Sequence, residues 1–561
     1  MRSWPMRRLH IVAISCVLLL FAVAHGSAAQ GGAVCGALAQ VPAARLPASA
    51  LGPAFQGATV ISTGDTWAVG DYYDDLNNRT SSLIEHWDGR AWTKVPSVDP
   101  GAGQNTLNDV AAASSSDVWA VGYEGPLVGV TPDYTLIEHW DGQAWEVVPS
   151  PNPSDVGINF LWGVVAIDAS HAWSVGTYDT GQGSLPLLER WDGTVWTAVS
   201  GPDVATYHDL YGVAGVLPDD VWAVGDHGTP PAPDQTLILH WDGSSWRVVP
   251  SPNVGSGHNI LEAVAALAAD DVWAVGYYFA GSSTFTLTEH WDGNSWKVVP
   301  SPNPFSDTNE LFGVSAVAPG DVWASGITGP APSSMLLHWD GTAWASLPVP
   351  DTSLLNRLDD VAAAAGGELW TVGETAMGSP NPRAYTARIC PVIVRDNGFT
   401  PPRSVGTEGG TVDWTFDPAN SQSHEVVDGS LGLFNSGQKA PGTSFAFTFE
   451  SAGTYLVVDP IHVESSKVLV PAVATPKSGG VGTQFTITWS AKSAKPGFVF
   501  DVQIKRPGST EFVDWMTDQI VRTSTFAPDS GTGTYSFRAR LRDASNGNAS
   551  GYSPPVSIAV H

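Results

Sequence analysis

Charged side chains are scarce in this sequence, and basic ones are the scarcest. Asp, Glu, Lys and Arg make up 14% of the 561 residues, with 26 Lys and Arg against 55 Asp and Glu. The formal net charge is −29, and no basic cluster offsets it. Nucleic acids and anionic membrane surfaces need a positive patch, so both are excluded as expected partners.

Long apolar runs are absent beyond the N-terminus. Arg7 and Arg8 precede the apolar run 11–24, and the small residues 27–29 offer a cleavage site before Gln30. This run is short for a bilayer span and has the features of an export signal. We therefore expect residues 1–29 to be a signal peptide and the mature protein to be secreted, with no later membrane insertion. An uncleaved anchor is the alternative.

Cysteine is nearly absent as well. Cys16 lies in the expected signal, which leaves Cys35 and Cys390 in the mature chain. An even number of cysteines in an oxidising compartment favours a disulfide between these two.

The sequence also lacks the common catalytic motifs. There is no Gly-x-Ser-x-Gly, no phosphate-binding loop, no His-Glu-x-x-His and no pair of thiols at zinc spacing. This favours a non-enzymatic protein, although catalytic residues that are scattered along the chain leave no such motif.

Tryptophan, glycine and proline are abundant, and they recur with a period. The sequence has 24 Trp, 59 Gly and 42 Pro. An Asp-x-Trp-Ala-Val-Gly segment recurs seven times with variations, and a His-Trp-Asp-Gly-x-x-Trp segment recurs six times. The tryptophans of the first segment are Trp67, Trp119, Trp173, Trp222, Trp273, Trp323 and Trp370.

Each repeat predicts four short strands, and a unit of about 50 residues is typical of a propeller blade. The recurring tryptophans are expected to pack between blades. The seventh repeat lacks an outer strand, and residues 40–42 near the N-terminus resemble the end of one. The sequence therefore predicts an all-β chain in which residues 30–390 form a seven-bladed β-propeller. The N-terminal strand closes it beside the expected Cys35–Cys390 bond.

The connections between strands are unequal in length, and the long ones are expected on one face. On that face, the position just after the leucine of each first strand differs from blade to blade. These residues are Phe55, Asn108, Trp162, Tyr211, Glu262, Phe312 and Asp359. Aromatic, amide and acidic groups together suit a polar ring such as a sugar, so they form the candidate ligand site. The alternative is that they only fill the mouth of the channel.

Other polar residues follow the repeat too closely to be catalytic. An Asp two residues before the first tryptophan and a His before the Trp-Asp-Gly recur in most blades, as in Asp117 and His139. Repetition in this form indicates a turn or packing role. The repeats resemble those of secreted bacterial propeller proteins, with an architecture similar to kelch-type and lectin-type propellers. This resemblance implies a fold but no activity.

Residues 391–472 resemble the cupredoxin family of blue copper proteins. The resemblance rests on Trp414 in the run 411–414, on 423–426, on 434–437 and on 452–455 leading to His462. The family fold is a β-sandwich, and its metal is held by two imidazoles, a thiolate and an axial Met.

The ligand positions of that family are only partly kept. His424 and His462 match the two imidazoles, Asp459 stands at the thiolate position, and the Met position falls near Ser465. The resemblance therefore does not imply a blue site. A set of two His and one Asp suits Cu(II) or Zn(II), and a site without any metal is the alternative.

Residues 473–561 resemble a fibronectin type III module, on the alternating runs 485–489, 500–504 and 534–540. Two functions follow from the whole sequence. The first is a secreted, monomeric binding protein whose propeller face presents a site for a glycan or a protein. The alternative is a metal-binding protein with copper or zinc at a non-blue site and a redox or metal-handling role.

Overall fold

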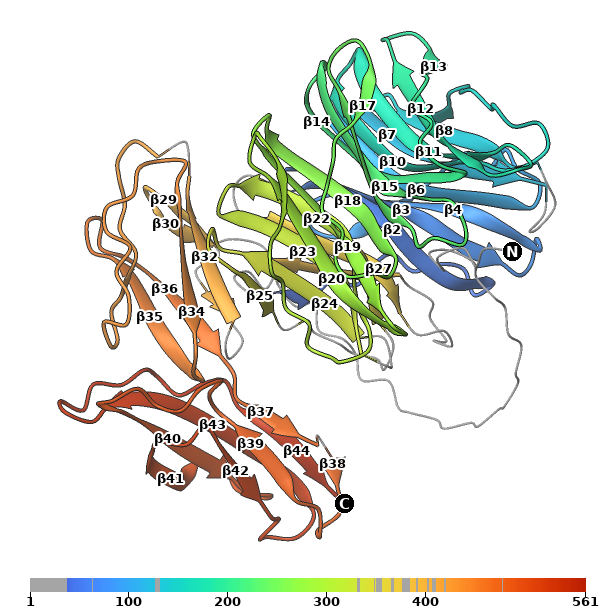
Figure 1. Cartoon of the computed structure of the whole chain (residues 1–561). Coiled ribbons are helices and arrows are strands. Elements are labelled where there is room, and N and C mark those ends of the chain that lie inside the picture. Colours follow the sequence, from blue (N-terminus) through green and yellow to red (C-terminus); the bar gives the residue numbers. More distant parts are fainter. Residues whose placement is uncertain are drawn as a thin grey trace. The chain divides into compact units, whose positions relative to one another are not determined.

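The computed structural model describes residues 38–561 apart from short gaps, and these residues form β-strands without any helix (Figure 1). The gaps are 63, 127–131, 330–332, 348, 350–355, 365–367, 376–383, 390–391, 401–402, 406–409, 418–419 and 477. Within the described residues, nothing helical has the length and hydropathy to span a membrane. The expected signal peptide, Cys35 and Cys390 lie outside them, so cleavage and the disulfide stay predictions.

The tryptophan repeats form antiparallel units of four strands, as their sequence predicts. A single residue pair joins the first unit to the last, and another joins the third to the fourth, which gives two eight-stranded sheets; each four-strand unit is called a sheet below. The first two repeats give β2 (Ala50–Ser62), β3 (Asp65–Asp74), β4 (Arg79–Trp87) and β5 (Trp92–Val95), then β6 (Gln104–Ser114), β7 (Asp117–Gly125), β8 (Tyr134–Trp140) and β9 (Trp145–Val147). The third and fourth give β10 (Asn159–Asp168), β11 (His171–Asp179), β12 (Ser184–Trp191) and β13 (Trp196–Ala198), then β14 (Tyr207–Leu217), β15 (Asp220–Gly228), β16 (Gln235–Trp241) and β17 (Trp246–Val248). The fifth and sixth give β18 (Asn259–Ala268), β19 (Asp271–Ala280), β20 (Ser283–Trp291) and β21 (Trp296–Val298), then β22 (Asn309–Ala318), β23 (Asp321–Thr328), β24 (Ser333–Trp339) and β25 (Trp344–Leu347).

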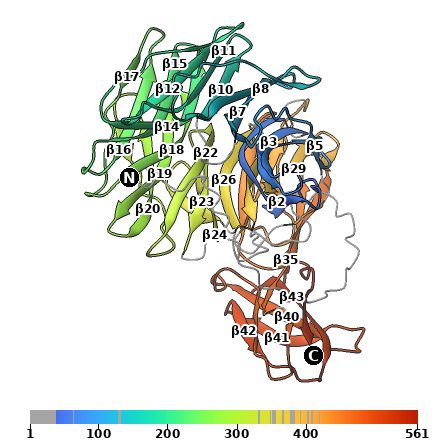
Figure 2. The same ribbon diagram turned by 90° about the vertical axis from the view of Figure 1, so that its right-hand side faces the viewer.

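The last sheet is completed by the other end of the repeat region. It consists of β26 (Asn356–Ala364), β27 (Glu368–Thr375), β28 (Tyr385–Ile389) and β1 (Ala39–Gln40). In β1, Ala39 pairs with Arg388 and Gln40 with Ala387, both antiparallel. The first strands of successive sheets also contact one another in a closed order: β2, β6, β10, β14, β18, β22, β26 and β2 again. Figure 2 shows part of this order, from β14 through β18, β22 and β26 to β2.

The glycine of each Val-Gly or Ser-Gly pair in the second strand is required by a close approach. A Cβ on Gly122 would lie 1.9 Å from the carbonyl oxygen of Thr106, and one on Gly176 would lie 1.8 Å from that of Phe160. No other residue fits there, because this contact is with backbone. The partner strand bulges by one residue at this level, between Leu107 and Asp109 in the second sheet.

The tryptophans pack between neighbouring sheets, as predicted. The ring of Trp119 lies 4.8 Å from that of Trp191 and 5.2 Å from that of Trp196, both in the next sheet. Such tilted and edge-on pairs add to the free energy of burying three large side chains. Six of the seven interfaces use the same three aromatic positions, whereas Trp323 packs against Tyr385 and aliphatic side chains of the last sheet.

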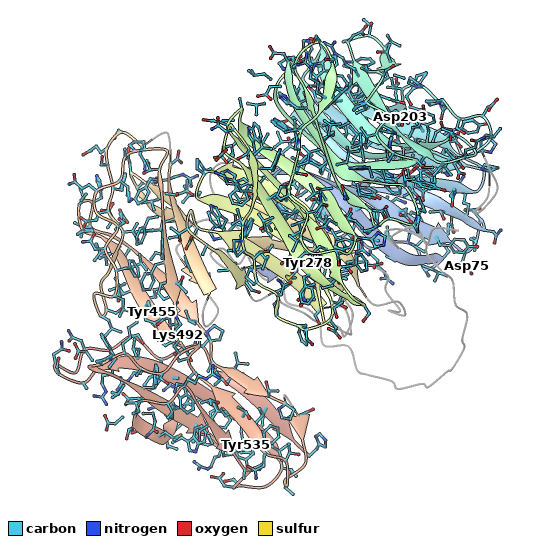
Figure 3. The ribbon with its side chains drawn as sticks, viewed as in Figure 1. Asp75, Asp203, Tyr278, Tyr455, Lys492 and Tyr535 are labelled. Atoms are coloured by element: carbon cyan, nitrogen blue, oxygen red, sulfur yellow. The ribbon has the colours of Figure 1, made fainter. Side chains whose placement is uncertain are left out.

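An asparagine clamps the loop before most first strands. The side-chain oxygen of Asn105 accepts a hydrogen bond from the N–H of Gly101 at 2.7 Å, and that of Asn159 accepts one from Ser154 at 2.8 Å. In the fourth sheet His208 takes this place and is fully buried. Its Nε2 accepts from the N–H groups of Val204 and Ala205, and Asp203, labelled in Figure 3, lies 3.8 Å away.

A buried glutamate recurs in the third strand of four sheets, and two of the four carboxylates accept a backbone hydrogen bond. Glu85 accepts from the N–H of Ala44 at 2.8 Å, and Glu138 from that of Val98 at 3.2 Å. Both donors lie two residues after the proline that ends the preceding sheet.

In the other two sheets, that donor position is occupied by proline, which has no N–H. Pro151 precedes the sheet of Glu189, and Pro252 precedes the sheet of Glu289. Both oxygens of Glu189 and of Glu289 are buried without a hydrogen bond. Burial raises the pKa of Glu289 to about 8 and that of Glu189 well above its usual value. Both carboxyls therefore stay largely protonated at neutral pH.

Residues 392–470 form two four-stranded sheets. One consists of β29 (Val392–Arg395), β30 (Gly398–Thr400), β32 (Gly410–Phe416) and β34 (Ser444–Phe449), and the other of β31 (Arg403–Val405), β33 (Val427–Asp428), β35 (Gly453–Asp459) and β36 (Glu464–Val470). Trp414, Phe434 and Tyr455 are among the side chains buried in their common core.

The last region also forms two sheets around one core. The strands are β37 (Val473–Thr475), β39 (Phe485–Thr488) and β42 (Thr523–Phe526) in one, and β38 (Ser478–Gly479), β40 (Phe498–Lys505), β41 (Val513–Gln519), β43 (Gly533–Asp543) and β44 (Val556–Val560) in the other. Trp489 and Tyr535 are buried, and the hydroxyl of Tyr535 donates to the carbonyl of Gly531 at 3.0 Å.

Candidate metal centre

The residues of the predicted propeller ligand site occupy the bulges of the first strands, with one exception. Asn108 is the extra residue between Leu107 and Asp109, and Trp162 and Tyr211 hold the same place in their sheets. In the first sheet the extra residue is Gln56, because Phe55 pairs with Gly70 as the leucines do elsewhere. Phe55 therefore lies one residue before the bulge, unlike the other six predicted residues.

These side chains are almost completely buried. None of the seven bulge residues is more than 8% exposed. Asn108 donates to the carbonyl of Leu161 at 2.7 Å, and the Tyr211 hydroxyl donates to Asp226 at 3.1 Å. A ligand would have to enter among side chains that already contact one another, and a ligand-binding role for them stays a prediction.

Phe312 and Asp359 share one cation. The guanidinium of Arg357 lies 4.2 Å from the centre of the Phe312 ring, and its Nε donates to Asp359 at 2.6 Å. Glu262, at 1% exposure, is the most buried acid of the set. The predicted set therefore lies within a network that includes a buried charge pair.

The repeated histidines of the propeller region pair with the repeated aspartates. In five sheets a His Nε2 contacts an Asp Oδ1, at 2.8 Å in four of them and 3.0 Å in the fifth. Each of these imidazoles also lies on the strand tryptophan, as His139 does on Trp119 with ring centres 4.1 Å apart. The pairs are His86–Asp65, His139–Asp117, His240–Asp220, His290–Asp271 and His338–Asp321.

In the seventh sheet an acidic and a basic residue of other types occupy the two positions of this pair. Glu368 stands at the Asp position and Arg388 at the His position, with Nε and Oε1 2.9 Å apart. An arginine cannot act as an acid, a base or an ordinary metal ligand, so the position serves packing and charge pairing. This geometry agrees with the turn or packing role that the sequence indicates for the repeated Asp and His.

One histidine cluster in the described residues differs from all these pairs: His424, Asp459 and His462. Asp459 ends β35, His462 lies in the four-residue loop before β36, and His424 lies just before β33. Backbone hydrogen bonds to Lys439 hold His424 in place, at 3.1 Å from its N–H and 2.8 Å to its carbonyl.

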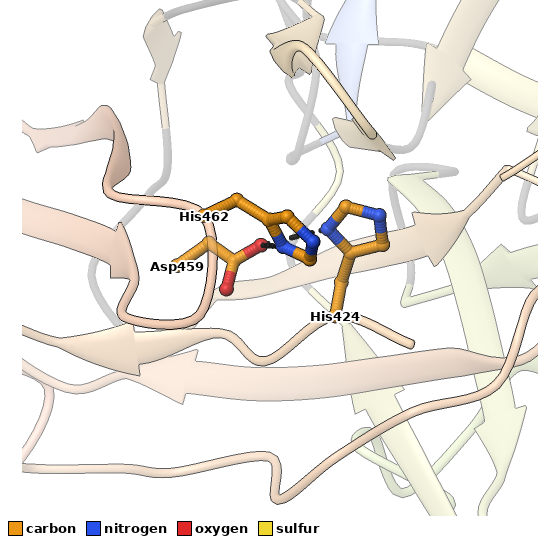
Figure 4. A group of neighbouring side chains, drawn as sticks. All are labelled: His424, Asp459 and His462. Atoms are coloured by element: carbon orange, nitrogen blue, oxygen red, sulfur yellow. Dashed lines mark hydrogen bonds and ion pairs between the residues drawn. The ribbon is translucent and has the colours of Figure 1, made fainter. Parts of the chain in front are cut away.

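Both imidazoles face the same carboxylate oxygen (Figure 4). Nδ1 of His424 lies 2.7 Å from Asp459 Oδ2, and Nδ1 of His462 lies 3.0 Å from it. The ring centres are 4.2 Å apart, and one donor atom from each residue lies within 4.8 Å of the other two. The structure thus brings together the three residues that the sequence singled out.

The cluster is shielded from water. His424 is 0% and Asp459 1% exposed, and the side chain of His462 is 16% exposed. Burial acts to raise the pKa of Asp459, but hydrogen bonds from His424, His462 and the Ile461 N–H outweigh it, so the pKa lies below its usual value. Asp459 is therefore a carboxylate at neutral pH.

The loop that carries His462 has an unusual backbone. Val463 has φ of 62° and is 89% exposed. A β-branched residue in this left-handed region is strained. The carboxylate of Asp459 also accepts from the N–H of Ile461 at 3.0 Å, which fixes the start of the loop.

The donor set fits a borderline divalent ion. Zinc binds nitrogen and oxygen ligands at about 2.0–2.2 Å, so two ligand atoms of one ion lie up to about 4 Å apart. The Nδ1–Oδ2 distances of 2.7 and 3.0 Å fall inside that range. His462 Nε2 is buried without a hydrogen bond, so the ring is not held by another protein group on that side.

One polar neighbour of the cluster was missed by the sequence analysis. Asp396 contacts Nε2 of His424 at 2.9 Å from a hairpin 28 residues earlier in the chain. No ligand motif of the resembled family includes it. Its only signal was the Asp-Asn-Gly turn at 396–398, which predicts a tight hairpin but not what its carboxylate contacts.

Comparison with solved structures shows similarity in fold for part of the chain. "YCF48 bound to D1 peptide" has 15% identity and a TM-score of 0.40, covering 63% of this chain and 97% of that one. The β-propeller domain of the Trilobed protease from Pyrococcus furiosus has 9% identity and a TM-score of 0.37, covering 60% and 95%. A polysaccharide lyase of family PL25, an ulvan lyase, has 11% identity and a TM-score of 0.38, covering 63% and 94%.

Similarity at this level carries no information about activity. No protein-family model matches the chain. No curated protein matches it at a significant level either.

Proposed function

We propose that this chain is an extracellular binding protein whose region 391–472 binds Cu(II) or Zn(II) through His424, Asp459 and His462. The observation that carries this proposal is the convergence of two imidazole Nδ1 atoms on one buried carboxylate oxygen. Uncharged nitrogen and anionic oxygen donors are the ligands that these ions accept. The proposal includes a cupredoxin-like sandwich for this region.

The proposed site is not a blue copper centre. A blue site needs a Cu–thiolate bond, and Asp459 supplies an oxygen where the resembled family has sulfur. The copper-loaded protein is therefore expected to show no intense absorption band between about 550 and 650 nm. Such a band would show that the ligand set is different.

The test is titration of the purified, metal-free mature chain with zinc chloride and with copper(II) sulfate. We expect one equivalent to bind, and His424→Ala to remove that binding. His139→Ala is the matched control, since it removes a repeated imidazole of the propeller region and should leave the stoichiometry at one. Absence of binding to the unmodified chain would refute the proposal.

We also propose the finer architecture that the sequence predicts: a seven-bladed propeller in 30–390 and a fibronectin type III-like module in 473–561. The closed order of first-strand contacts supports the blade number, and the Tyr535 hydroxyl bond to the backbone four residues upstream supports the module.

A second function, binding of a glycan or protein at the propeller face, rests on one observation. The bulge residues vary between sheets while the residues around them repeat. Trp162→Ala with Tyr211→Ala should then abolish binding to any glycan that an array identifies. Unchanged affinity would leave these side chains a packing role only.

A further inference from the structure

Asp396 lies in the tightest turn of the metal-binding region. Arg395 of β29 pairs with Gly398 of β30, so the hairpin loop consists of Asp396 and Asn397 alone. Gly398 has φ of 125°, which glycine tolerates. The turn therefore fixes the position of the Asp396 carboxylate relative to the sheet.

Ser421 occupies one oxygen of that carboxylate. Its N–H donates to Asp396 Oδ2 at 2.9 Å, and its hydroxyl donates to the same atom at 2.7 Å. The N–H of Asp396 in turn donates to Asn420 at 3.1 Å. Two donors on Oδ2 therefore hold the carboxyl group in one orientation and leave Oδ1 on the side of His424.

The other oxygen faces His424. Asp396 Oδ1 lies 2.9 Å from Nε2 of a ring that has no exposed surface. A carboxylate only accepts hydrogen bonds, so Nε2 must carry a hydrogen. Figure 4 shows one nitrogen of this ring toward His462 and Asp459 and the other on the far side of the ring.

A neutral imidazole has one N–H and one lone pair. Nδ1, the other ring nitrogen, lies 2.7 Å from Asp459 Oδ2, at hydrogen-bond distance from it. A metal at this site would take the place of the hydrogen between these two atoms, while Nε2 keeps its hydrogen toward Asp396. We propose that Asp396 is a positioning residue that keeps the ring hydrogen of His424 at Nε2, so that Nδ1 is the nitrogen that binds the metal. Carboxylate partners of metal-bound histidines commonly have this role. The inference rests on the proposed metal site.

Asp396→Asn is the most informative variant because it keeps size and shape. The backbone N–H of Ser421 always needs an acceptor, so the amide oxygen is expected at the Oδ2 position. The amide NH₂ then faces His424 and donates to Nε2, which moves the ring hydrogen to Nδ1 and blocks the metal ligand. A role limited to anchoring the hairpin would be served by Asn as well as by Asp.

The experiment combines zinc titration with electron paramagnetic resonance of the copper(II)-loaded full mature chain. We expect zinc affinity to fall by about 10- to 100-fold in Asp396→Asn and also in Asp396→Ala. The number of coupled nitrogens on copper should fall from two to one in Asp396→Asn. Asn397→Ala, in the same turn, should leave both measurements unchanged, and melting of the metal-free variants shows whether each is folded.

Two results overturn the inference, and they are distinguishable. If the unmodified chain binds metal and Asp396→Asn binds it equally well with two coupled nitrogens, Asp396 does not position His424, while the metal site stands. If the unmodified chain binds neither ion, the proposed function fails and this inference fails with it.

Discussion

Histidine and aspartate meet in two parts of this molecule, in different ways. In the propeller region each of the five repeated imidazoles contacts one carboxylate, lies on a tryptophan and is about 30% exposed, as in His240–Asp220. Before β33 and after β35, one carboxylate oxygen faces two imidazoles and is almost fully buried. In a pair of one Asp and one His, the imidazole N–H and the carboxylate oxygen are donor and acceptor to each other. Two imidazoles on one oxygen leave a set of donors that a metal can share.

The same comparison applies to deviations within the repeat. His208 stands where other sheets have asparagine, and Glu289 has lost the donor that Glu138 keeps. At each of these buried positions, a substitution is expected to change the pH dependence of the stability of the protein.

The largest effect is expected when the aspartate of each kind of His–Asp contact is replaced by alanine and the two variants are compared. Asp459→Ala should weaken zinc binding by more than about 100-fold, because it removes the anionic ligand. Asp117→Ala should leave zinc binding unchanged and cost about 1 kcal/mol of stability through the lost hydrogen bond to His139. Calorimetric titration and thermal melting measure the two effects. Equal zinc affinity in both variants would remove the distinction.

Glu289→Gln should stabilise the protein, and more so as the pH rises. The pKa of Glu289 is raised to about 8 in the folded chain, so folding keeps a proton that the unfolded chain loses above about pH 4.5. Stability from this group is therefore full in acid and is lost as the pH rises toward 8. We expect the variant to gain about 2 kcal/mol at pH 8 and little at pH 4.5. Melting curves across this range test it, and a gain independent of pH would contradict it.

The smallest effect is expected at the histidine that replaces the asparagine clamp. Burial lowers the pKa of His208, against an opposing effect of Asp203. Its Nε2 accepts from backbone N–H groups, so only the neutral ring fits. Stability is therefore present above the usual His pKa of about 6.5 and is lost as the pH falls below it.

His208→Asn should remove that acid sensitivity and gain about 1 kcal/mol at pH 5, with no gain at pH 7.5. Hydrogen exchange of the loop 201–206 at the two pH values is the measurement. If this loop exchanges equally in the two proteins at pH 5, the neutral-ring interpretation is incorrect.

The repeat made much of this structure predictable. The order of strands, the packing of Trp119 against Trp191 and Trp196, and the pairing of β1 with β28 all follow from one sequence period. Phe55 was misplaced because a bulge adds a residue without any mark in the sequence, and Phe55 fills a leucine position.

The candidate metal centre was predictable only in part. His424, Asp459 and His462 were found because they match positions of a family in which ligands converge. Asp396 matches no such position, and its contact with His424 depends on how a hairpin and a loop 28 residues apart come together. Tertiary contacts of this kind leave no period and no local motif.

The pairing of β1 with β28 also sets an order of events during synthesis. Val41 and Thr386, which are joined by a hydrogen bond, are 345 residues apart. At about 5–20 residues per second, a ribosome needs about 20–70 s to add the later residue after the earlier one. During that interval β1 has been made but has no partner strand. The strand that is translated first is thus among the last to be hydrogen-bonded, and the final sheet is completed only after nearly the whole repeat region has been made.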